Sequence, residues 1–282
     1  MTQIFYTIKD LQNALTSHKA GGQRIGFVPT MGNLHAGHLS LVEIASRHAD
    51  VVVVSIFVNP TQFGVGEDFD NYPRTLEDDM QKLQQSQCTY VFAPSIEEMY
   101  PVYPPNVQVL SGDITKILCG KTRPTHFDGV GLVVGKLFNI VRPDVAVFGK
   151  KDYQQLAIIR QLNRELNFGI EIIGGDIVRD TDGLALSSRN GYLTKEERAQ
   201  APVIHQTLQA LAKQLQVAAF DEFTTLVTQA AQSLNAQGLR VDYLELLTDT
   251  LAVPTPKDKQ LTLLAAIYVG QARLLDNIEI NL

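Results

Sequence analysis

The chain reads RIGFVPTMGNLHAGH from Arg24 to His38, and this segment is the most informative part of the sequence. Its first half is apolar and short, which predicts a buried strand over residues 24–28. Apolar residues recur at helical spacing after His38, so a helix is expected to follow. The two histidines then lie at a strand-to-helix turn that glycines allow to be tight. The first backbone N–H groups of the helix lack partners within it, which makes this turn a natural phosphate seat.

The same alternation of strand and helix continues along the chain. The predicted strands cover residues 24–28, 51–57, 90–92, 145–148 and 170–173, and the predicted helices cover 8–20, 76–87, 130–140 and 152–166 besides the helix after His38. Alternation of this kind over about 175 residues is typical of an α/β fold with a doubly wound parallel sheet. Ligands bind such sheets at the carboxyl ends of the strands.

The pattern changes after Val178. Two long helices are predicted over 194–216 and 221–236, followed by strand-like runs over 243–247 and 261–269. These elements predict a smaller α+β domain with an antiparallel sheet. We therefore expect a Rossmann-like domain over residues 1–177 and a small C-terminal domain over 178–282.

Composition narrows the class of partner. The chain has 282 residues, 45% of them hydrophobic, which suffices for a sizeable core. Its net charge is −6 and it has no basic run. We therefore expect small substrates rather than a nucleic-acid partner. No secretory signal or membrane-spanning run is visible, which predicts a cytoplasmic protein without a membrane partner. Cys88 and Cys119 lack metal-like spacing and are expected to be reduced, partly buried thiols.

Polar side chains follow two of the predicted strands. Asn59 and Gln62 begin a polar loop over 59–72, and their amides suit hydroxyl and carboxylate groups. Ordinary turn chemistry is the alternative, because Asn-Pro favours turns. After the strand 145–148, Lys151 could contact phosphates, Asp152 could cap a helix or hold a ribose, and Gln155 would face the same cleft. The alternative there is an N-capping aspartate beside solvated lysines.

Three further segments carry candidate groups. Ser187, Ser188 and Arg189 on a flexible loop suit a triphosphate, with a plain interdomain turn as the alternative. Arg123 and His126 precede a helix and could reach phosphate or substrate, although a surface loop is the simpler interpretation of that segment alone. The acidic cluster with Asp78 and Asp79 could serve Mg²⁺, but acidic residues are also favoured in any first helical turn.

The His-x-Gly-His pair resembles the signature of the nucleotidylyl-transferase superfamily, whose members bind ATP. Over essentially the whole chain, five segments resemble the pantoate–β-alanine ligase family in order and spacing: VPTMGNLHAGH, SIFVNPTQF, YPRT, KDYQQ and DGLALSSRN. Lys150 and Thr125 depart from residues that are common in the family, and neither departure removes a functional group.

The resemblance implies an ATP-dependent ligation of (R)-pantoate and β-alanine through a pantoyl adenylate, with release of pyrophosphate and AMP. It places His35 and His38 on the phosphates, with His38 as the proton donor, and it implies a homodimer. The remaining ATP contacts that it implies are Met31, Gly32, Asn33, Leu34, Ala36, Gly37, Gly149, Lys150, Lys151, Asp152, Val178, Leu186, Ser187, Ser188 and Arg189.

The family pattern also assigns the other substrates. Gln62 and Gln155 would hold pantoate, with Gln62 near β-alanine as well. Asn59, Tyr72, Arg123 and His126 are further substrate candidates, and Asp78 and Asp79 are metal candidates, with Mg²⁺ held mainly through the ATP phosphates. The C-terminal domain, with the loop 183–190, is expected to close over the labile adenylate.

Two other classes of protein compete with this interpretation. An adenylyltransferase for a phosphorylated acceptor shares the histidine motif, but such enzymes are typically shorter, and the C-terminal domain and its Ser-Ser-Arg loop argue against it. A non-catalytic nucleotide-binding protein would keep the fold without the reaction. Both histidines, Lys151 and Arg189 are present, so the sequence shows no sign of a lost site.

Overall fold

The computed structural model describes residues 2–64 and 66–282. Met1, the first residue of the predicted first domain, and Val65, which falls in the predicted loop 59–72, lie outside the described residues. Contacts within the chain separate two compact units. The first contains the residues up to Lys150 together with Gln154–Asp176, and the second contains Lys151–Tyr153 and Ile177–Leu282.

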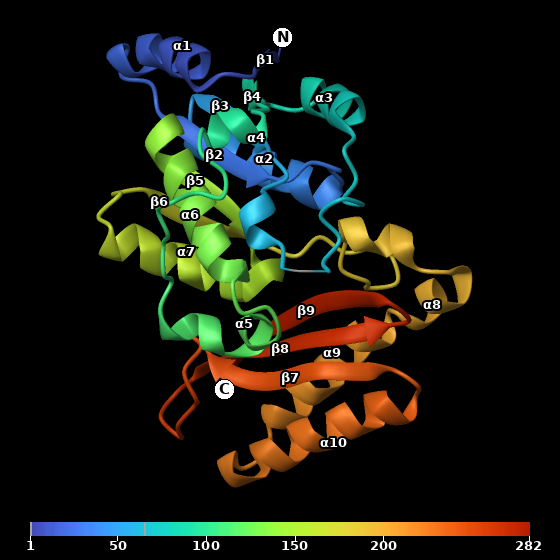
Figure 1. Cartoon of the computed structure of the whole chain (residues 1–282). Helices are drawn as coiled ribbons and strands as arrows, with labels where there is room; N and C mark the ends of the chain where they lie inside the picture. The colour runs from blue at the N-terminus through green and yellow to red at the C-terminus, as the bar shows by residue number, and fades with distance from the viewer. Residues whose placement is uncertain (1, 65) are drawn as a thin grey trace. The chain divides into compact units, whose positions relative to one another are not determined.

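The first unit is built on a parallel sheet of six strands in the order β1-β4-β3-β2-β5-β6 (Figure 1). Its strands are β1 (Gln3–Phe5), β2 (Ile25–Thr30), β3 (Val51–Ile56), β4 (Tyr90–Phe92), β5 (Val145–Gly149) and β6 (Glu171–Gly175). The predicted doubly wound parallel sheet is thereby confirmed. Strand β1 was not predicted, since three residues are too few to show a period.

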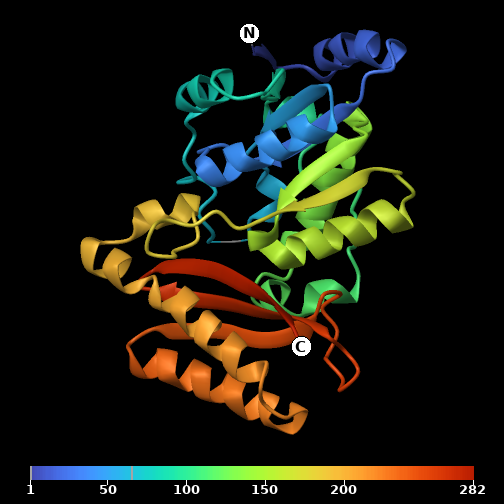
Figure 2. The same cartoon turned by 180° about the vertical axis from the view of Figure 1, so that it is seen from behind.

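Helices cover both faces of this sheet. The helices of the first unit are α1 (Ile8–Ala20), α2 (Ala36–His48), α3 (Leu76–Gln84), α4 (Ile96–Met99), α5 (Leu118–Thr122), α6 (His126–Val141) and α7 (Tyr153–Glu165), and α2 and α6 contact strands of the sheet. Helix α6 lies in front of the sheet in Figure 1, and α2 lies in front of it in Figure 2. The valines of β3 are therefore buried from both sides and at most 2% exposed.

The strand order places the ends of β2 and β5 at a topological switch point. From β2 the chain moves outward to β3 and β4, and it then returns to β5 and β6 on the other side of β2. The loops that leave β2 and β5 consequently diverge at the carboxyl edge of the sheet. Open parallel sheets bind their ligands in the crevice that such a divergence creates.

The second unit has an antiparallel sheet of three strands, β7 (Arg240–Thr248), β8 (Gln260–Val269) and β9 (Ala272–Asn281). Helices α9 (Val203–Leu215) and α10 (Phe223–Ala236) pack on this sheet, and the short α8 (Lys195–Gln200) precedes them. Leucines of α9 and aliphatic residues of β8 form one core cluster, which includes Leu208, Leu211, Leu263 and Ile267. The predicted α+β C-terminal fold is confirmed.

Two details of this unit differ from the prediction. The helix expected over 194–216 is two helices, because Pro202 lacks the N–H that a continuous helix needs and instead precedes the first turn of α9. Strand β9 was not predicted, although Gly270 and Gln271 join it to β8 in a two-residue turn. Gly270 has a φ of 57°, which is typical of such tight hairpins.

Candidate active site

The loop after β2 ends in a helix cap made by both histidines. His35 is the N-cap of α2, and its Nδ1 accepts the backbone N–H of Gly37 at 3.1 Å. The backbone N–H of His35 in turn donates to Nδ1 of His38 at 3.3 Å. This reciprocal arrangement is a capping box in which histidines stand where serine and glutamate are usual. The two ring centroids lie 4.2 Å apart, so the two imidazoles are in contact.

The cap fixes the tautomer of both histidines. A ring nitrogen that accepts an N–H bond carries no proton, so a neutral ring places its proton on the other nitrogen. His35 and His38 both accept through Nδ1, and each neutral imidazole therefore carries its proton on Nε2. Both Nε2–H groups are hydrogen-bond donors at the N-terminus of α2, where the helix dipole favours an anion.

A buried carboxylate holds the backbone of the same loop. Asp79 of α3 is fully buried, and its two oxygens accept the backbone N–H groups of Asn33 at 2.8 Å and Leu34 at 2.7 Å. Gly32 and Asn33 have φ values of 83° and 51°, in the left-handed region that glycine adopts readily and asparagine more often than most residues. Lys82 adds a bond from Nζ to the carbonyl of Leu34 at 2.7 Å. Helix α3 thus stabilises the left-handed turn before the histidines.

These bonds bear on the metal prediction. Asp78 is exposed, and both oxygens of Asp79 already accept backbone N–H groups. Among residues 2–64 and 66–282, no group of three or more His, Cys, Asp or Glu side chains is placed to hold a metal ion. The side chains therefore do not fit a metal cage made by the protein alone. Metal binding by Asp78 and Asp79 stays a prediction, and the geometry gives Asp79 a structural role instead.

The loop after β3 is organised by Asn59, which is 1% exposed. Its Nδ2 donates to Oε1 of Gln62 at 3.1 Å and to the carbonyl of Gly129 at 3.2 Å. Its Oδ1 accepts the hydroxyl of Tyr100 at 2.9 Å, and burial raises the pKa of that tyrosine to about 12. Asn59 therefore orients Gln62, while its predicted contact with substrate stays a prediction.

Gln62 joins the two loops of the first unit. Its Nε2 lies 3.0 Å from Sδ of Met31, so a residue predicted for pantoate contacts one predicted for ATP. Its carbonyl accepts a bond from Nδ1 of His126 at 2.8 Å and lies 3.4 Å from Nη2 of Arg123. Four of the predicted site residues are thus brought together at the carboxyl edge of the sheet.

Arg123 is already paired within the protein. Its Nε donates to Glu67 at 2.7 Å, and its Nη2 donates to the other oxygen of the same carboxylate at 2.5 Å. Burial by itself raises the pKa of Glu67, but the bonds and the charge of Arg123 hold that pKa below its usual value. Tyr72, the fourth of the further substrate candidates, is buried with its ring edge-on to Phe63. Substrate contact by Arg123 and Tyr72 stays a prediction.

Gln154 and Gln155, which follow Lys151 and Asp152, have different surroundings. Gln154 is 4% exposed and donates to the carbonyls of Ile114 and Ile117, both at 2.8 Å. Its amide is therefore used to hold the chain before α5. Gln155, the predicted pantoate contact, is only half-buried at the start of α7.

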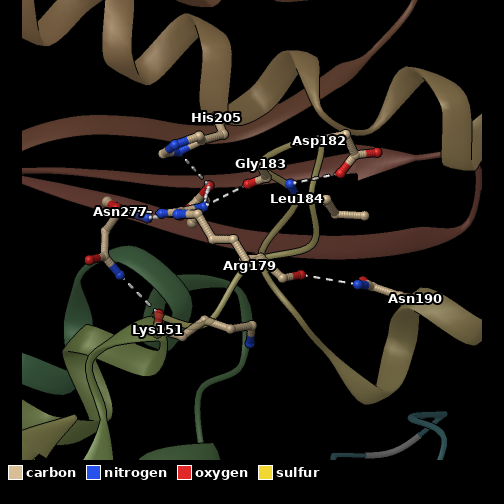
Figure 3. A network of polar contacts seen from close by, with 10 residues as sticks. Lys151, Arg179, Asp182, Gly183, Leu184, Asn190, His205 and Asn277 are labelled. Atoms are coloured by element: carbon tan, nitrogen blue, oxygen red, sulfur yellow. Dashed lines mark hydrogen bonds and ion pairs between the residues drawn. The ribbon is translucent and has the colours of Figure 1, made fainter. Parts of the chain in front are cut away.

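The predicted triphosphate loop belongs to the second unit. Ser187 caps the short 3₁₀ helix Ser188–Tyr192 by accepting the N–H of Arg189 at 3.2 Å. Asn190 donates to the carbonyl of Ala185 at 3.0 Å, as Figure 3 shows for the labelled Asn190. Lys151 is assigned to this unit as well, and Asn277 donates to its carbonyl at 3.1 Å. Lys151 and the loop thus belong to one compact body, although they are far apart in sequence.

Sequence reasoning missed the side chains that support these loops. Asp79 was considered as a metal ligand or as an ordinary first-turn acid, Gln154 was given no role of its own, and Asp276 and Asn277 were not considered. The latter three are buried and distant in sequence from the segments that they hold, so no local pattern marks them. The one available signal was the polar pair Asp276-Asn277 within an otherwise apolar run.

Two other predictions can be compared with the structure. Cys88 and Cys119 are not in a disulfide, both are buried rather than partly buried, and burial raises the pKa of the Cys88 thiol to about 12. Within the described part of the chain, no helix is both long enough and apolar enough to cross a bilayer.

Comparison with known proteins identifies the family and the relatives that this chain resembles. A family model described as pantoate-beta-alanine ligase matches residues 3–279. A pantothenate synthetase from Psychrobacter sp. (strain PRwf-1) is 58% identical over 286 residues, which cover 100% of each chain.

Two solved structures are also similar. A pantothenate synthetase from Thermus thermophilus has a TM-score of 0.91 at 42% identity, over 99% of this chain and 100% of that one. A pantoate-beta-alanine ligase from Francisella tularensis, solved in complex with beta-gamma ATP and beta-alanine, has a TM-score of 0.77 at 34% identity. That match covers 99% of this chain and 97% of the other.

Proposed function

Because this chain belongs to the pantoate–β-alanine ligase family, we propose that it joins (R)-pantoate to β-alanine at the expense of ATP. The single observation that carries the assignment of roles is the paired-histidine cap of α2. It presents two imidazole N–H donors and a helix N-terminus at the switch point of the sheet, where a triphosphate is best accommodated.

The reaction proceeds in two steps. In the first, a carboxylate oxygen of pantoate attacks the α-phosphorus of ATP, the bond to the bridging oxygen breaks, and pyrophosphate leaves. In the second, the amine of β-alanine attacks the acyl carbon of pantoyl adenylate, loses a proton and expels AMP. Negative charge builds on the phosphate oxygens in the first step, so placed donors are the main requirement.

His35 and His38 supply two of these donors. Their Nε2–H groups are oriented by the cap before ATP arrives, so little reorganisation is needed as charge develops. We assign His38 as the residue that donates to the phosphate oxygens as the leaving group departs. Asp79 holds the preceding turn, which keeps both rings at a fixed distance from the end of β2.

Charge neutralisation falls to the second unit. Lys151, Ser187, Ser188 and Arg189 offer two cations and two hydroxyls, which suit the β- and γ-phosphates and the leaving pyrophosphate. We propose that these groups and the histidines act on one ATP molecule. The remaining predicted ATP contacts, from Met31 to Gly37 and at Gly149, Lys150, Asp152, Val178 and Leu186, would form the nucleoside and phosphate surroundings.

Pantoate has hydroxyl and carboxylate groups, which amides recognise well. We propose that Gln62 and Gln155 hold it, and the bond from Asn59 orients the Gln62 amide for this role. Gln62 would also lie near β-alanine when the amine attacks. Closure of the C-terminal unit would keep water from the adenylate, as the resemblance implies.

Magnesium would enter with ATP. Mg²⁺ commonly keeps several waters and binds through substrate phosphates, which agrees with a site that has no protein cage in the described residues. When bound, it would neutralise phosphate charge. We further propose a cytoplasmic homodimer, whose oligomeric state light scattering of the purified chain tests directly.

Product analysis tests the reaction. The chain is incubated with MgATP, pantoate and β-alanine, and each component is omitted in turn. Pyrophosphate is expected only when pantoate is present, and pantothenate with AMP only when β-alanine is added. Pyrophosphate without any AMP would instead indicate an adenylyltransferase that leaves AMP on its acceptor. Absence of all products with a folded protein would leave a nucleotide-binding protein.

A further inference from the structure

Strand β9 carries a buried carboxylate that forms a bidentate pair with one arginine. Asp276 is 5% exposed, and its two oxygens accept Nη1 and Nη2 of Arg179, both at 2.7 Å. This two-pronged pairing is the strongest geometry available to a carboxylate and a guanidinium. The backbone N–H of Asn277 donates to the same carboxylate at 2.7 Å. Nδ1 of His205 lies 3.5 Å from it, within ion-pair distance but without a formed hydrogen bond.

Arg179 passes this anchorage on to the loop that follows it. Its Nη1 also donates to the carbonyl of Gly183 at 3.1 Å, a bond drawn in Figure 3. Backbone bonds close the same turn, from Asp180 to Leu184 at 2.8 Å and from Leu186 to Val178 at 2.9 Å. The segment that leads into Ser187 is therefore fixed to β9 through one side chain.

The next residue on β9 holds a different part of the proposed phosphate site. Asn277 is 4% exposed, and its Nδ2 donates to the carbonyl of Lys151 at 3.1 Å, a contact drawn in Figure 3. Lys151 stands 126 residues earlier in the chain. Two consecutive residues of one strand thus anchor both segments from which the second unit would contact a triphosphate.

Folding alone does not explain this placement. A buried ion pair is weak support for stability, since apolar residues of similar size often serve equally well. The second unit also contains a comparison: Arg273 and Asp242 pair at 2.6 Å with similarly low exposure. None of the hydrogen bonds described for that pair reaches Lys151 or the loop 183–190. The two pairs resemble each other in chemistry and differ in what they hold.

We propose that Asp276 and Asn277 are positioning residues for adenylation: Asp276 orients the Ser-Ser-Arg loop through Arg179, and Asn277 orients the backbone of Lys151. The proposal rests on the function proposed above. It assigns to β9 the task of holding the loop cations and the lysine in one fixed arrangement, so that both meet the same triphosphate. Misplacement of such groups by about 1 Å is enough to lower a rate by about 10²-fold.

The test compares Asp276→Asn with the matched variant Asp242→Asn, both in the full chain. Pyrophosphate release is measured with ATP and pantoate, each varied separately. Asp276→Asn is expected to lower kcat/KM for ATP by about 10- to 100-fold and to leave KM for pantoate unchanged, because the pantoate candidates lie in the first unit. Asp242→Asn is expected to keep the wild-type values. Asn277→Leu tests the contact to Lys151, with the same expected direction.

Hydrogen–deuterium exchange supplies a second readout. Faster exchange of the amides of residues 180–193 is expected in Asp276→Asn and not in Asp242→Asn. Should Asp276→Asn fail to fold, Arg179→Lys keeps the charge pair but lacks the fork that reaches Gly183, and the same shifts are expected.

Equal losses in Asp276→Asn and Asp242→Asn would overturn the proposal, and so would a wild-type kcat/KM for ATP in Asp276→Asn. If the wild-type chain releases no pyrophosphate with ATP and pantoate, the proposed function fails. The exchange comparison then still decides whether β9 holds the loop.

Discussion

Replacement of Asp79 by asparagine should release the turn that precedes the two histidines. The carboxylate is fully buried and accepts N–H groups from Asn33 and Leu34, one on each oxygen. An amide of the same shape has only one oxygen. Whichever way it is oriented, its NH₂ group faces a backbone N–H, and one buried donor loses its acceptor.

The cost follows from those bonds. A hydrogen bond to a charged group contributes about 1.5–3 kcal/mol, and an unsatisfied buried donor costs about 1–3 kcal/mol. Because these two ranges describe partly the same lost bond, they are not fully additive, and the expected loss is about 3–5 kcal/mol, compared with a total stability of about 5–15 kcal/mol. The protein should still fold at 25 °C. If the whole loss falls on global unfolding, Tm decreases by about 6–20 °C.

Function should suffer beyond this loss of stability. The left-handed turn at Gly32 and Asn33 would relax, so the histidine cap would be in its active position for only part of the time. The apparent affinity for ATP falls in proportion to the fraction of molecules with the cap in place, and KM for ATP should rise by at least about 10-fold. Pyrophosphate release at 25 °C measures it, with thermal unfolding recorded in parallel. Asp78→Asn, at the exposed neighbouring position, is the control and should behave as wild type.

A magnesium titration at saturating ATP separates this reasoning from a metal role for Asp79. A loop anchor leaves the Mg²⁺ midpoint unchanged, because no metal bond is lost. A metal ligand would shift the midpoint upward while Tm without metal stayed near the wild-type value. That second pattern would refute the structural account.

Three further changes have expected outcomes. His38→Ala should keep the fold and lower the adenylation rate by about 10²–10³-fold, as for loss of one transition-state donor. His48→Ala, at the exposed end of α2, is the control and should keep the wild-type adenylation rate. Full adenylation activity in His38→Ala would contradict the role assigned to His38. Gly129→Ala places a methyl group against the backbone of Thr61 and should destabilise by about 1–3 kcal/mol and raise KM for pantoate, while Gly135→Ala in the same helix meets only Phe168 at 3.9 Å and should be neutral or stabilising in thermal unfolding. The pKa of Glu67 is lowered in the folded state, so its contribution to stability is present above the unfolded-state pKa of about 4.3 and is lost as pH falls through the folded-state pKa. Glu67→Gln should therefore lose Tm less steeply than the wild type below about pH 4.5. The same dependence of Tm on pH in both proteins would contradict this.

Much of the fold could be predicted from local pattern. The short apolar runs in β2, β3 and β5 indicate burial on both faces, most clearly the four consecutive valines of β3. Elements without such a pattern were missed or merged. The edge strand β1 is too short, and Pro202 divides a helix that periodicity alone made continuous.

The candidate site divides in the same way. Residues on the loops after β2 and β3 were predicted because each motif is contiguous, with its chemistry and its turn signals side by side. The supporting residues were not predicted. Asp79 reads as an ordinary first-turn acid of α3, and only packing brings its carboxylate to the backbone of Asn33 and Leu34.

Local sequence pattern was enough to identify which groups are available: two histidines at a strand-to-helix turn, amides after a buried strand, and a Ser-Ser-Arg loop beyond the sheet. These are local facts, because period, turn chemistry and motif spacing act over a few residues. Long-range packing set the surroundings of those groups, including the buried Asp79 that holds the backbone of Asn33 and Leu34 and the assignment of Lys151 to the second unit. Such features depend on the geometry of individual hydrogen bonds, many of them between residues far apart in the chain, and packing rather than sequence neighbourhood sets that geometry.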